Sequence, residues 1–230
     1  MTSDLYLPAL RPFSWLFNKY YGDDVQVLVA GFAPPSSPLP HNFSFLSLGD
    51  QADYPFNKWS DGLIKLLNTI DDEVFILFLD DYWLTRPVNR QAVQILVDYA
   101  IQFRYVLKID LCTERLYAFG SDLEYGHVAW IDLVKSMPGS PYHMSLWLGI
   151  WRRDNLLRCL VPDESPHDLE MGGSTMGSHI QDLIVLGTRQ NPARISLGLR
   201  GGDHSQVNLE GLAQQDVEEM EQKGYFEVYK

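Results

Sequence analysis

The sequence predicts a soluble α/β fold in which helices flank a mostly parallel central sheet. Two observations lead to this prediction. Apolar runs alternate with stretches of helical spacing over residues 1–110, and the run Val74–Leu79 contains six apolar residues without polar alternation. Strands that alternate with helices form parallel sheets covered on both faces. The 230 residues fit a single domain, because about 150 residues per domain is only a soft guide.

Apolar runs and turn signals define the elements of the first half. Strands are predicted at residues 25–30, 42–48, 74–79 and 105–111. The third is expected to be a central strand, because it is apolar on both sides. Helices are expected from Ser60, read as an N-cap, and from Pro87, read as a first-turn proline.

The second half is less regular. Turn residues are frequent between Gly120 and Pro141, which predicts an irregular excursion. A short helix at 153–160, a strand at 184–186 and an acidic helix at 216–224 follow. We therefore divide the predicted domain into a nucleotide-binding half (20–111), an acceptor and catalytic half (112–215) and a C-terminal helix (216–224).

Composition limits the class of partner. Thirty acidic and 18 basic residues give a net charge of −12, which repels polyanions and argues against an extended nucleic-acid surface. No stretch reaches the about 20 apolar residues that a membrane span needs. The first ten residues lack the basic start of a signal peptide. Cys112 and Cys159 are read as buried thiols, and we expect a cytoplasmic protein.

Ligands of parallel α/β sheets bind beyond the carboxyl ends of the strands. Gly31, Asp53 and the pair Asp80-Asp81 follow predicted strands, so all are expected along one rim. Two neighbouring carboxylates repel unless a cation or hydrogen-bond donors compensate. Mg²⁺ or Mn²⁺ would relieve that repulsion and bind diphosphate oxygens. Turn and helix-capping roles are the alternative explanation.

A second group of polar residues lies between residues 145 and 170. Glu170 and Asp168 follow a proline-constrained turn, and either is a candidate base that accepts the proton of an attacking hydroxyl. Arg152 and Arg153 are candidate phosphate contacts; the alternative for the pair is a surface or ion-pair role.

Several short sequence motifs are similar to motifs of a known protein family. They are the segments at residues 75–84 (Phe-Ile-Leu-Phe-Leu-Asp-Asp-Tyr-Trp-Leu), 151–157 (Trp-Arg-Arg-Asp-Asn-Leu-Leu) and 165–170 (Ser-Pro-His-Asp-Leu-Glu), preceded by 39–43, 47–49 and 59–60. Together they resemble a group of small bacterial and phage glycosyltransferases with the GT-A fold. The resemblance extends over roughly residues 20–172.

The resemblance implies a nucleotide-sugar donor and a divalent metal, Mn²⁺ or Mg²⁺. Asp80, Asp81 and Tyr82 stand where the family has its metal- and diphosphate-binding motif, although that motif is usually Asp-any-Asp. Glu170 matches the acidic residue of the catalytic turn. His204 corresponds to the late histidine that such enzymes sometimes supply to the metal.

These observations predict hexosyl-type transfer from a nucleoside-diphosphate sugar to a saccharide or another hydroxyl acceptor. In this hypothesis Asp53 lies on the nucleoside side of the pocket. A non-catalytic nucleotide- or carbohydrate-binding protein of the same fold is the alternative. A nucleotidyltransferase is a further alternative, although Gly31 is followed by prolines instead of a glycine-rich phosphate loop. The sequence leaves open the nucleoside, the sugar, the acceptor and the stereochemistry.

Overall fold

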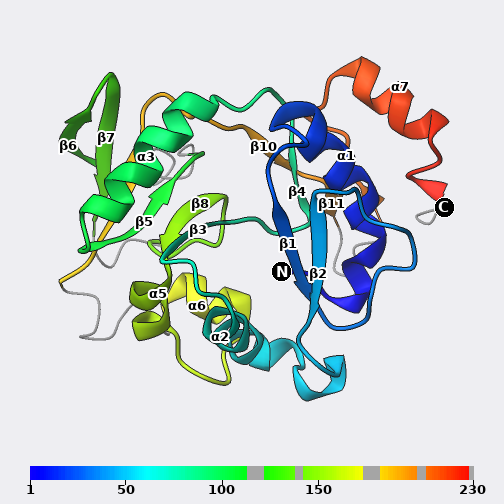
Figure 1. The fold of residues 1–230 in the computed structure, drawn as a ribbon, viewed down its shortest axis with the longest axis horizontal. Coiled ribbons are helices and arrows are strands. Elements are labelled where there is room, and N and C mark those ends of the chain that lie inside the picture. The colour runs from blue at the N-terminus through cyan, green and yellow to red at the C-terminus, as the bar shows by residue number, and fades with distance from the viewer. Residues whose placement is uncertain (113–121, 138–141, 173–181, 201–205, 228–230) are drawn as a thin grey trace. The chain divides into compact units, whose positions relative to one another are not determined.

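The computed structural model describes residues 1–112, 122–137, 142–172, 182–200 and 206–227. The chain forms two compact units. Unit 1 consists of Met1–Gln51, Leu79–Val88 and Ala193–Lys230, and unit 2 consists of Ala52–Phe78 and Asn89–Pro192. Each unit contains its own strand pairs, so each is described by itself (Figure 1).

Unit 1 is built from short helices and three strand pairs. Its helices are η1 (Asp4–Ala9), α1 (Leu10–Tyr20) and α7 (Gln214–Gln222). Its strands are β1 (Val27–Gly31), β2 (Phe43–Ser47), β4 (Tyr82–Leu84), β10 (Ile195–Leu197), β11 (Leu199–Arg200) and β12 (Gln206–Val207). The pair β1–β2 is parallel, whereas β4–β10 and β11–β12 are antiparallel.

Helix α1 supplies much of the core of unit 1. Phe13 and Phe17 are buried on it and both meet Phe43 edge-on, with ring centroids 6.4 and 5.6 Å apart. This helix was not among the predicted elements. Ala9 precedes it without a side-chain cap, and Pro12 lies inside it, so the usual start signals are missing.

Unit 2 contains a six-stranded sheet with the order β3-β8-β5-β9-β7-β6. Its strands are β3 (Val74–Leu77), β5 (Val106–Asp110), β6 (Asp122–Val128), β7 (Ile131–Ser136), β8 (Gly149–Arg152) and β9 (Ile184–Thr188). Its helices are η3 (Phe56–Lys58), α2 (Trp59–Thr69), α3 (Arg90–Gln102), α5 (Arg153–Cys159) and α6 (Pro166–Met171), while η2 (Gln51–Asp53) spans the boundary between the units.

The α/β class is confirmed, but the expectation of a mostly parallel sheet is wrong. Four of the five neighbouring strand pairs described in this sheet are antiparallel, and only β5–β9 is parallel. Strands β3, β5 and β9 share one direction, as strand–helix units predict. Strand β8 comes from later in the chain and inserts between β3 and β5 in the opposite direction. A run of apolar residues indicates that a strand is buried, but it does not indicate whether the strand runs parallel or antiparallel to its neighbours.

Two further expectations about the sheet are corrected. The run at 74–79 was predicted as a central strand, whereas β3 lies at one edge of the sheet, with Val74–Ile76 only half-buried. The excursion expected between residues 120 and 141 contains the antiparallel hairpin β6–β7. Strand β6 is largely exposed, so it has no apolar pattern that would reveal it.

Other elements follow the prediction closely. The strands expected at 25–30, 42–48, 105–111 and 184–186 are present, as are the short helix at 153–160 and the C-terminal helix. Helix α3 begins later than Pro87, because the Asn89 side chain caps it by accepting a hydrogen bond from the Ala92 N–H at 3.1 Å. Ser60 lies inside α2 and accepts a hydrogen bond from the Glu164 N–H at 3.0 Å instead of acting as a cap.

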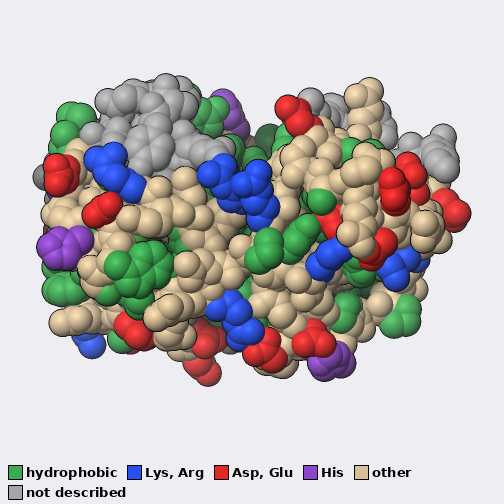
Figure 2. All heavy atoms as spheres, turned by 90° about the horizontal axis from the view of Figure 1, so that it is seen from above, with side chains coloured by type: hydrophobic (Ala, Val, Ile, Leu, Met, Phe, Trp, Pro, Cys, Tyr) green, Lys and Arg blue, Asp and Glu red, His purple; other side chains and the backbone are tan. Residues whose placement is uncertain are grey.

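Charged side chains are dispersed over the face shown in Figure 2. Lys and Arg side chains lie there in separate groups, interspersed with Asp and Glu. Within the described part of the chain, no helix is both long enough and apolar enough to cross a membrane.

Candidate functional site

The acidic pair lies in unit 1, immediately before β4. Asp80 is buried, and its carboxylate accepts a hydrogen bond from the Thr2 hydroxyl. Its backbone carbonyl accepts a hydrogen bond from the Trp83 indole at 3.2 Å. Asp81 and Tyr82 are half-buried. The pair is therefore held in a partly enclosed setting and does not project freely into water.

The electrostatics of the pair are unfavourable to two negative charges. Burial raises the pKa of Asp80 to about 7; the nearby amino group of Met1 opposes this shift, and Asp81 adds to it. The pKa of Tyr6 is also raised, first by burial and then by the charges of Asp81 and Asp80. Both shifts indicate a local excess of negative charge in this part of unit 1.

The N-terminal segment reaches Asp80 because Gly31 has no side chain. The Thr2 N–H donates to the Ala30 carbonyl at 2.8 Å, so the segment runs along the end of β1. A Cβ atom on Gly31 would lie 2.6 Å from Cγ2 of Thr2 and 3.2 Å from the Phe45 ring. Gly31 was predicted to lie along the ligand-binding rim, and the structure shows the chain's own Thr2 packed against it.

The other side of the pair is fixed by the strand pair β4–β10. The Gly198 N–H donates to the Asp81 carbonyl at 2.6 Å, and Tyr82 pairs with Leu197. Gly198 lies flat against the Trp83 indole, where any Cβ atom would overlap the ring. Backbone contacts from residues far apart in sequence thus set the position of Asp80-Asp81-Tyr82.

Glu170 lies on α6 in unit 2 and is anchored through one carboxylate oxygen. That oxygen accepts a hydrogen bond from the Leu146 N–H at 2.7 Å. The preceding carbonyl, that of Ser145, accepts a hydrogen bond from the Lys108 ammonium at 2.6 Å. Glu170 and Lys108 therefore hold the 145–147 segment from two elements, α6 and β5.

Asp168 has a local structural role. It forms a capping box with Ser165: the Ser165 hydroxyl accepts the Asp168 N–H at 3.1 Å, and the Asp168 carboxylate accepts the Ser165 N–H at 3.1 Å. The hydrogen bonds from the Ser165 hydroxyl and backbone lower the pKa of Asp168. A lowered pKa makes this carboxylate a weaker base than an ordinary aspartate.

Arg152 and Arg153 donate hydrogen bonds to backbone carbonyls at the C-terminal ends of two helices. Arg152 is buried, pairs with Glu73, and donates to the carbonyls of Ala100 and Ile101 at the end of α3. Arg153 donates to the Ile70 carbonyl at the end of α2 at 2.6 Å. These contacts explain the positions of both arginine side chains without a bound phosphate.

Sequence reasoning missed a buried ion pair in β5. The side chains of Lys108 and Asp110 are 0% and 1% exposed and form a salt bridge, and the Lys108 ammonium also lies 5.0 Å from the centre of the Trp151 ring. The signal for it was the alternation Lys-Ile-Asp inside an otherwise apolar run. A charged residue on the inward side of a strand marks a buried polar group.

The remaining predicted residues are more dispersed. Asp53 is exposed in η2 and belongs to unit 2, whereas Gly31, Asp80, Asp81 and Tyr82 belong to unit 1. His204 lies outside the described residues. Within the described ranges no group of three or more His, Cys, Asp or Glu side chains is placed to hold a metal ion. A cation at the acidic pair would need other oxygens, such as those of a diphosphate or water, to complete its shell.

Comparison with protein-family models, curated proteins and solved structures gave no match. The buried acidic pair is the feature of this chain that points most directly to a function.

Proposed function

We propose that the protein is a glycosyltransferase that transfers a sugar, of hexosyl type, from a nucleoside-diphosphate sugar to a hydroxyl acceptor with the help of a divalent metal. The observation that supports this proposal is the setting of Asp80 and Asp81. Asp80 is buried, has a raised pKa and adjoins a second carboxylate. Such a pair ionises at a free-energy cost that a bound cation would relieve.

The donor set fits Mg²⁺ or Mn²⁺. Magnesium is commonly bound by one or two protein carboxylates, with substrate phosphates and water completing the shell. Asp80 and Asp81 would hold the ion. When bound, the metal would neutralise charge on the departing diphosphate. Tyr82 directly follows the pair, is half-buried, and offers aromatic surface to a base or sugar ring.

Glu170 is the proposed base. In the transfer step the acceptor oxygen would bond to the anomeric carbon and give its proton to a general base, the role that the sequence predicts for Glu170. The bond from that carbon to the diphosphate breaks, and the diphosphate leaves with the electron pair. The hydrogen bond from Leu146 fixes the direction of the Glu170 carboxylate. Asp168, predicted as the second candidate, is engaged in the capping box and is assigned no catalytic step.

Ligand-induced stabilisation tests the donor site. Thermal unfolding is measured with a panel of nucleoside diphosphates and nucleotide sugars, each with and without Mn²⁺. Binding at a hundredfold excess over Kd adds about 2.7 kcal/mol, which corresponds to a rise of roughly 5–10 °C in Tm for a chain of this size. We expect one nucleoside diphosphate to give a metal-dependent rise that Asp81→Asn abolishes.

The matched control is Asp23→Asn, which removes an exposed carboxylate of the same unit. This variant should keep the full rise in Tm. If Asp81→Asn responds like Asp23→Asn, the donor site is not at the acidic pair. Donor hydrolysis without acceptor then separates an enzyme from a binding protein, because a non-catalytic protein would show the rise in Tm without releasing diphosphate.

A further inference from the structure

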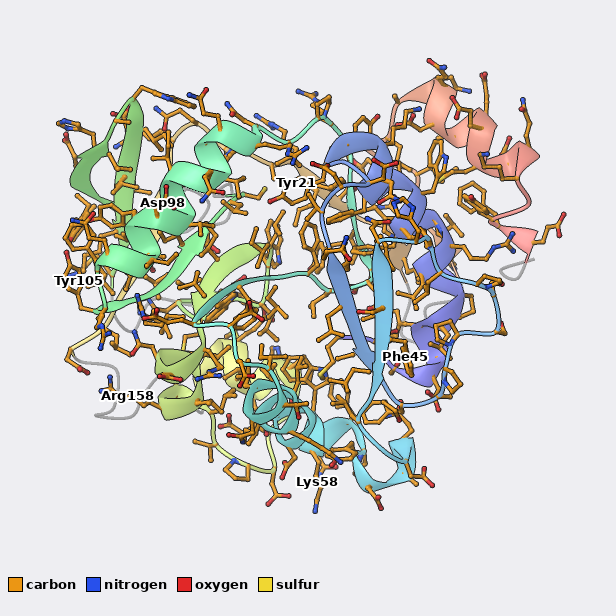
Figure 3. All side chains as sticks on the ribbon, in the orientation of Figure 1. Tyr21, Phe45, Lys58, Asp98, Tyr105 and Arg158 are labelled. Carbon is orange, nitrogen blue, oxygen red and sulfur yellow. The ribbon has the colours of Figure 1, made fainter. Side chains whose placement is uncertain are left out.

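Unit 2 carries a group of four aromatic residues, two exposed and two half-buried, that the proposed transfer chemistry does not use. Tyr99 and Phe103 lie at the end of α3, Tyr105 precedes β5, and Tyr125 lies on β6. We call these four residues the tyrosine cluster. The rings of Tyr99 and Phe103 are 4.4 Å apart, and those of Phe103 and Tyr105 are 5.7 Å apart. Figure 3 labels Tyr105 beyond the C-terminal end of α3.

The hydroxyl groups of two of the tyrosines meet. Those of Tyr105 and Tyr125 are 3.3 Å apart and form a hydrogen bond. The pKa of Tyr99 is raised first by burial and then by a hydrogen bond with Tyr105, with Tyr125 contributing as well. A phenol oxygen can both donate one hydrogen bond and accept others, so the bonded pair Tyr105–Tyr125 can still bind a further hydroxyl group.

A β-bulge directs Tyr125 toward the other two. The register of β6 against β7 passes from Glu124–Val134 to Gly126–Leu133, so Tyr125 is the extra residue. Gly126 follows with φ of +140°, a conformation that side-chain-bearing residues rarely adopt. Bulges of this kind commonly redirect a side chain near a functional surface.

The backbone beneath the cluster is fixed. The Phe103 N–H donates to the Tyr99 carbonyl, the Val106 N–H to the Phe103 carbonyl and the Ile184 N–H to the Tyr105 carbonyl, each at 3.0 Å. The backbone that carries Tyr99, Phe103 and Tyr105 is therefore held in place before any ligand arrives. Such preorganisation lowers the entropic cost of binding.

The surface of the cluster is both aromatic and hydroxylated. Tyr105 is 40% exposed and Tyr125 37% exposed, so each ring is still accessible. The ring faces suit apolar C–H groups, and the phenols suit hydroxyl groups. Sugar rings present both kinds of group. The net charge of −12 disfavours anionic ligands by comparison.

We propose that the tyrosine cluster is a binding site for neutral saccharide chains, with a sugar ring stacked on Tyr105 or Tyr125 and its hydroxyls bonded to their phenols. Its use as the acceptor site rests on the proposed transferase function, whereas saccharide binding itself does not.

The test is titration of the whole protein with maltohexaose, cellohexaose, mannohexaose and chitohexaose, without donor or metal. Binding is followed by calorimetry and by ¹⁹F NMR of protein labelled with 3-fluorotyrosine. At least one oligosaccharide should bind and shift the resonances of Tyr105 and Tyr125. Tyr105→Ala should weaken binding by about tenfold, and Tyr105→Phe by a few-fold, as expected for losing a stacking contact or one hydrogen bond.

Two further variants sharpen the result. Gly126→Ala strains the bulge and should weaken binding although it removes no cluster atom. Phe56→Ala removes another exposed aromatic ring of unit 2, 72% exposed, and should leave the affinity unchanged. Circular dichroism of each variant confirms that it is folded.

Three outcomes would overturn the proposal: none of the oligosaccharides binds, Phe56→Ala weakens binding as much as Tyr105→Ala, or the protein self-associates through the cluster. Sedimentation of Tyr105→Ala against the parent detects the last case, in which the cluster is covered by a second copy. A failure of the donor experiment with retained saccharide binding would contradict only the transferase function.

Discussion

At the scale of single residues, Asp80 shows how the fold turns an ordinary side chain into a candidate functional group. The carboxylate itself is unremarkable in sequence, and Thr2, which bonds to it, lies 78 positions away. No local pattern links the two. Burial and the adjoining Asp81 then raise the pKa of Asp80 to about 7, which makes the group sensitive to pH and to cations near neutrality.

This raised pKa predicts how stability depends on pH. The unfolded chain has an ordinary Asp pKa of about 3.9, so between that value and 7 the folded state binds the additional proton. The contribution of Asp80 to the free energy of unfolding must then decrease as pH rises through this window, because the slope follows the difference in bound protons. Asp80→Asn should therefore be more stable than the parent at pH 8 by a larger margin than at pH 5.

Urea unfolding of both proteins at pH 5 and pH 8 measures this difference. Asp23→Asn, on the surface of the same unit, serves as the control and should follow the parent at both pH values. Identical pH dependence of the parent and Asp80→Asn would show that Asp80 titrates normally.

Arg152 allows a prediction that separates stability from ligand binding. Its guanidinium is buried and bonded to Glu73 and to the carbonyls of Ala100 and Ile101. Arg152→Ala should cost about 3 kcal/mol, because it removes a charged donor from two backbone carbonyls at the end of α3. Arg158→Ala, which removes an exposed pair with Asp182, should cost about 1 kcal/mol or less. Chemical unfolding gives both values.

The same variant tests the phosphate role suggested by sequence. A fully folded Arg152→Ala protein should retain the donor-induced rise in Tm, because the structural contacts account for the arginine. If the Arg152→Ala protein has normal stability but loses the donor-induced rise in Tm, Arg152 is a phosphate ligand.

At the scale of elements, the positions of strands were predictable, but their order was not. Tyr105–Leu111 and Val25–Ala30 reveal their strands through apolar residues, which any buried strand requires. The insertion of Gly149–Arg152 between β3 and β5 has no local signal, since neighbouring strands are chosen by packing across the whole sheet. Strand β6 was missed because its exposed face carries no apolar pattern.

Strand β5 supports a prediction about its buried ion pair. Lys108→Met alone would leave Asp110 charged and buried, and Asp110→Leu alone would do the same to Lys108. Each single change should cost about 3–5 kcal/mol, whereas the double change should cost far less than the sum. A double-mutant cycle of unfolding free energies measures the coupling. Additive costs would show that the two side chains do not stabilise each other.

At the scale of the whole molecule, the division into two units explains why the candidate site was only partly predictable. The sequence placed Gly31, Asp53 and the acidic pair on one rim of one sheet. Asp53 instead belongs to unit 2, whereas Gly31 and the pair belong to unit 1. Spacing along the chain identified residues that follow strands, but the assignment of each strand to a sheet depends on contacts between distant segments.

The two units also predict how the molecule unfolds. Compact units with separate cores commonly open as separate cooperative steps. Gly198→Ala, which crowds Trp83 in unit 1, and Arg152→Ala in unit 2 should therefore lower the stability of different groups of amides. Native-state hydrogen exchange by mass spectrometry detects this. Equal loss of protection throughout the chain for both variants would indicate a single cooperative unit.

The pairing of β4 with β10 has a consequence for synthesis. A ribosome releases residues in order, so unit 2 has its complete sequence once Pro192 has emerged, whereas β4 must await Ile195–Leu197. During that interval the backbone edge of β4 lacks its partner, and Asp81 lacks the Gly198 amide that holds its carbonyl. The acidic pair is thus among the last features to be assembled, and an incomplete chain ending before residue 195 cannot fold it.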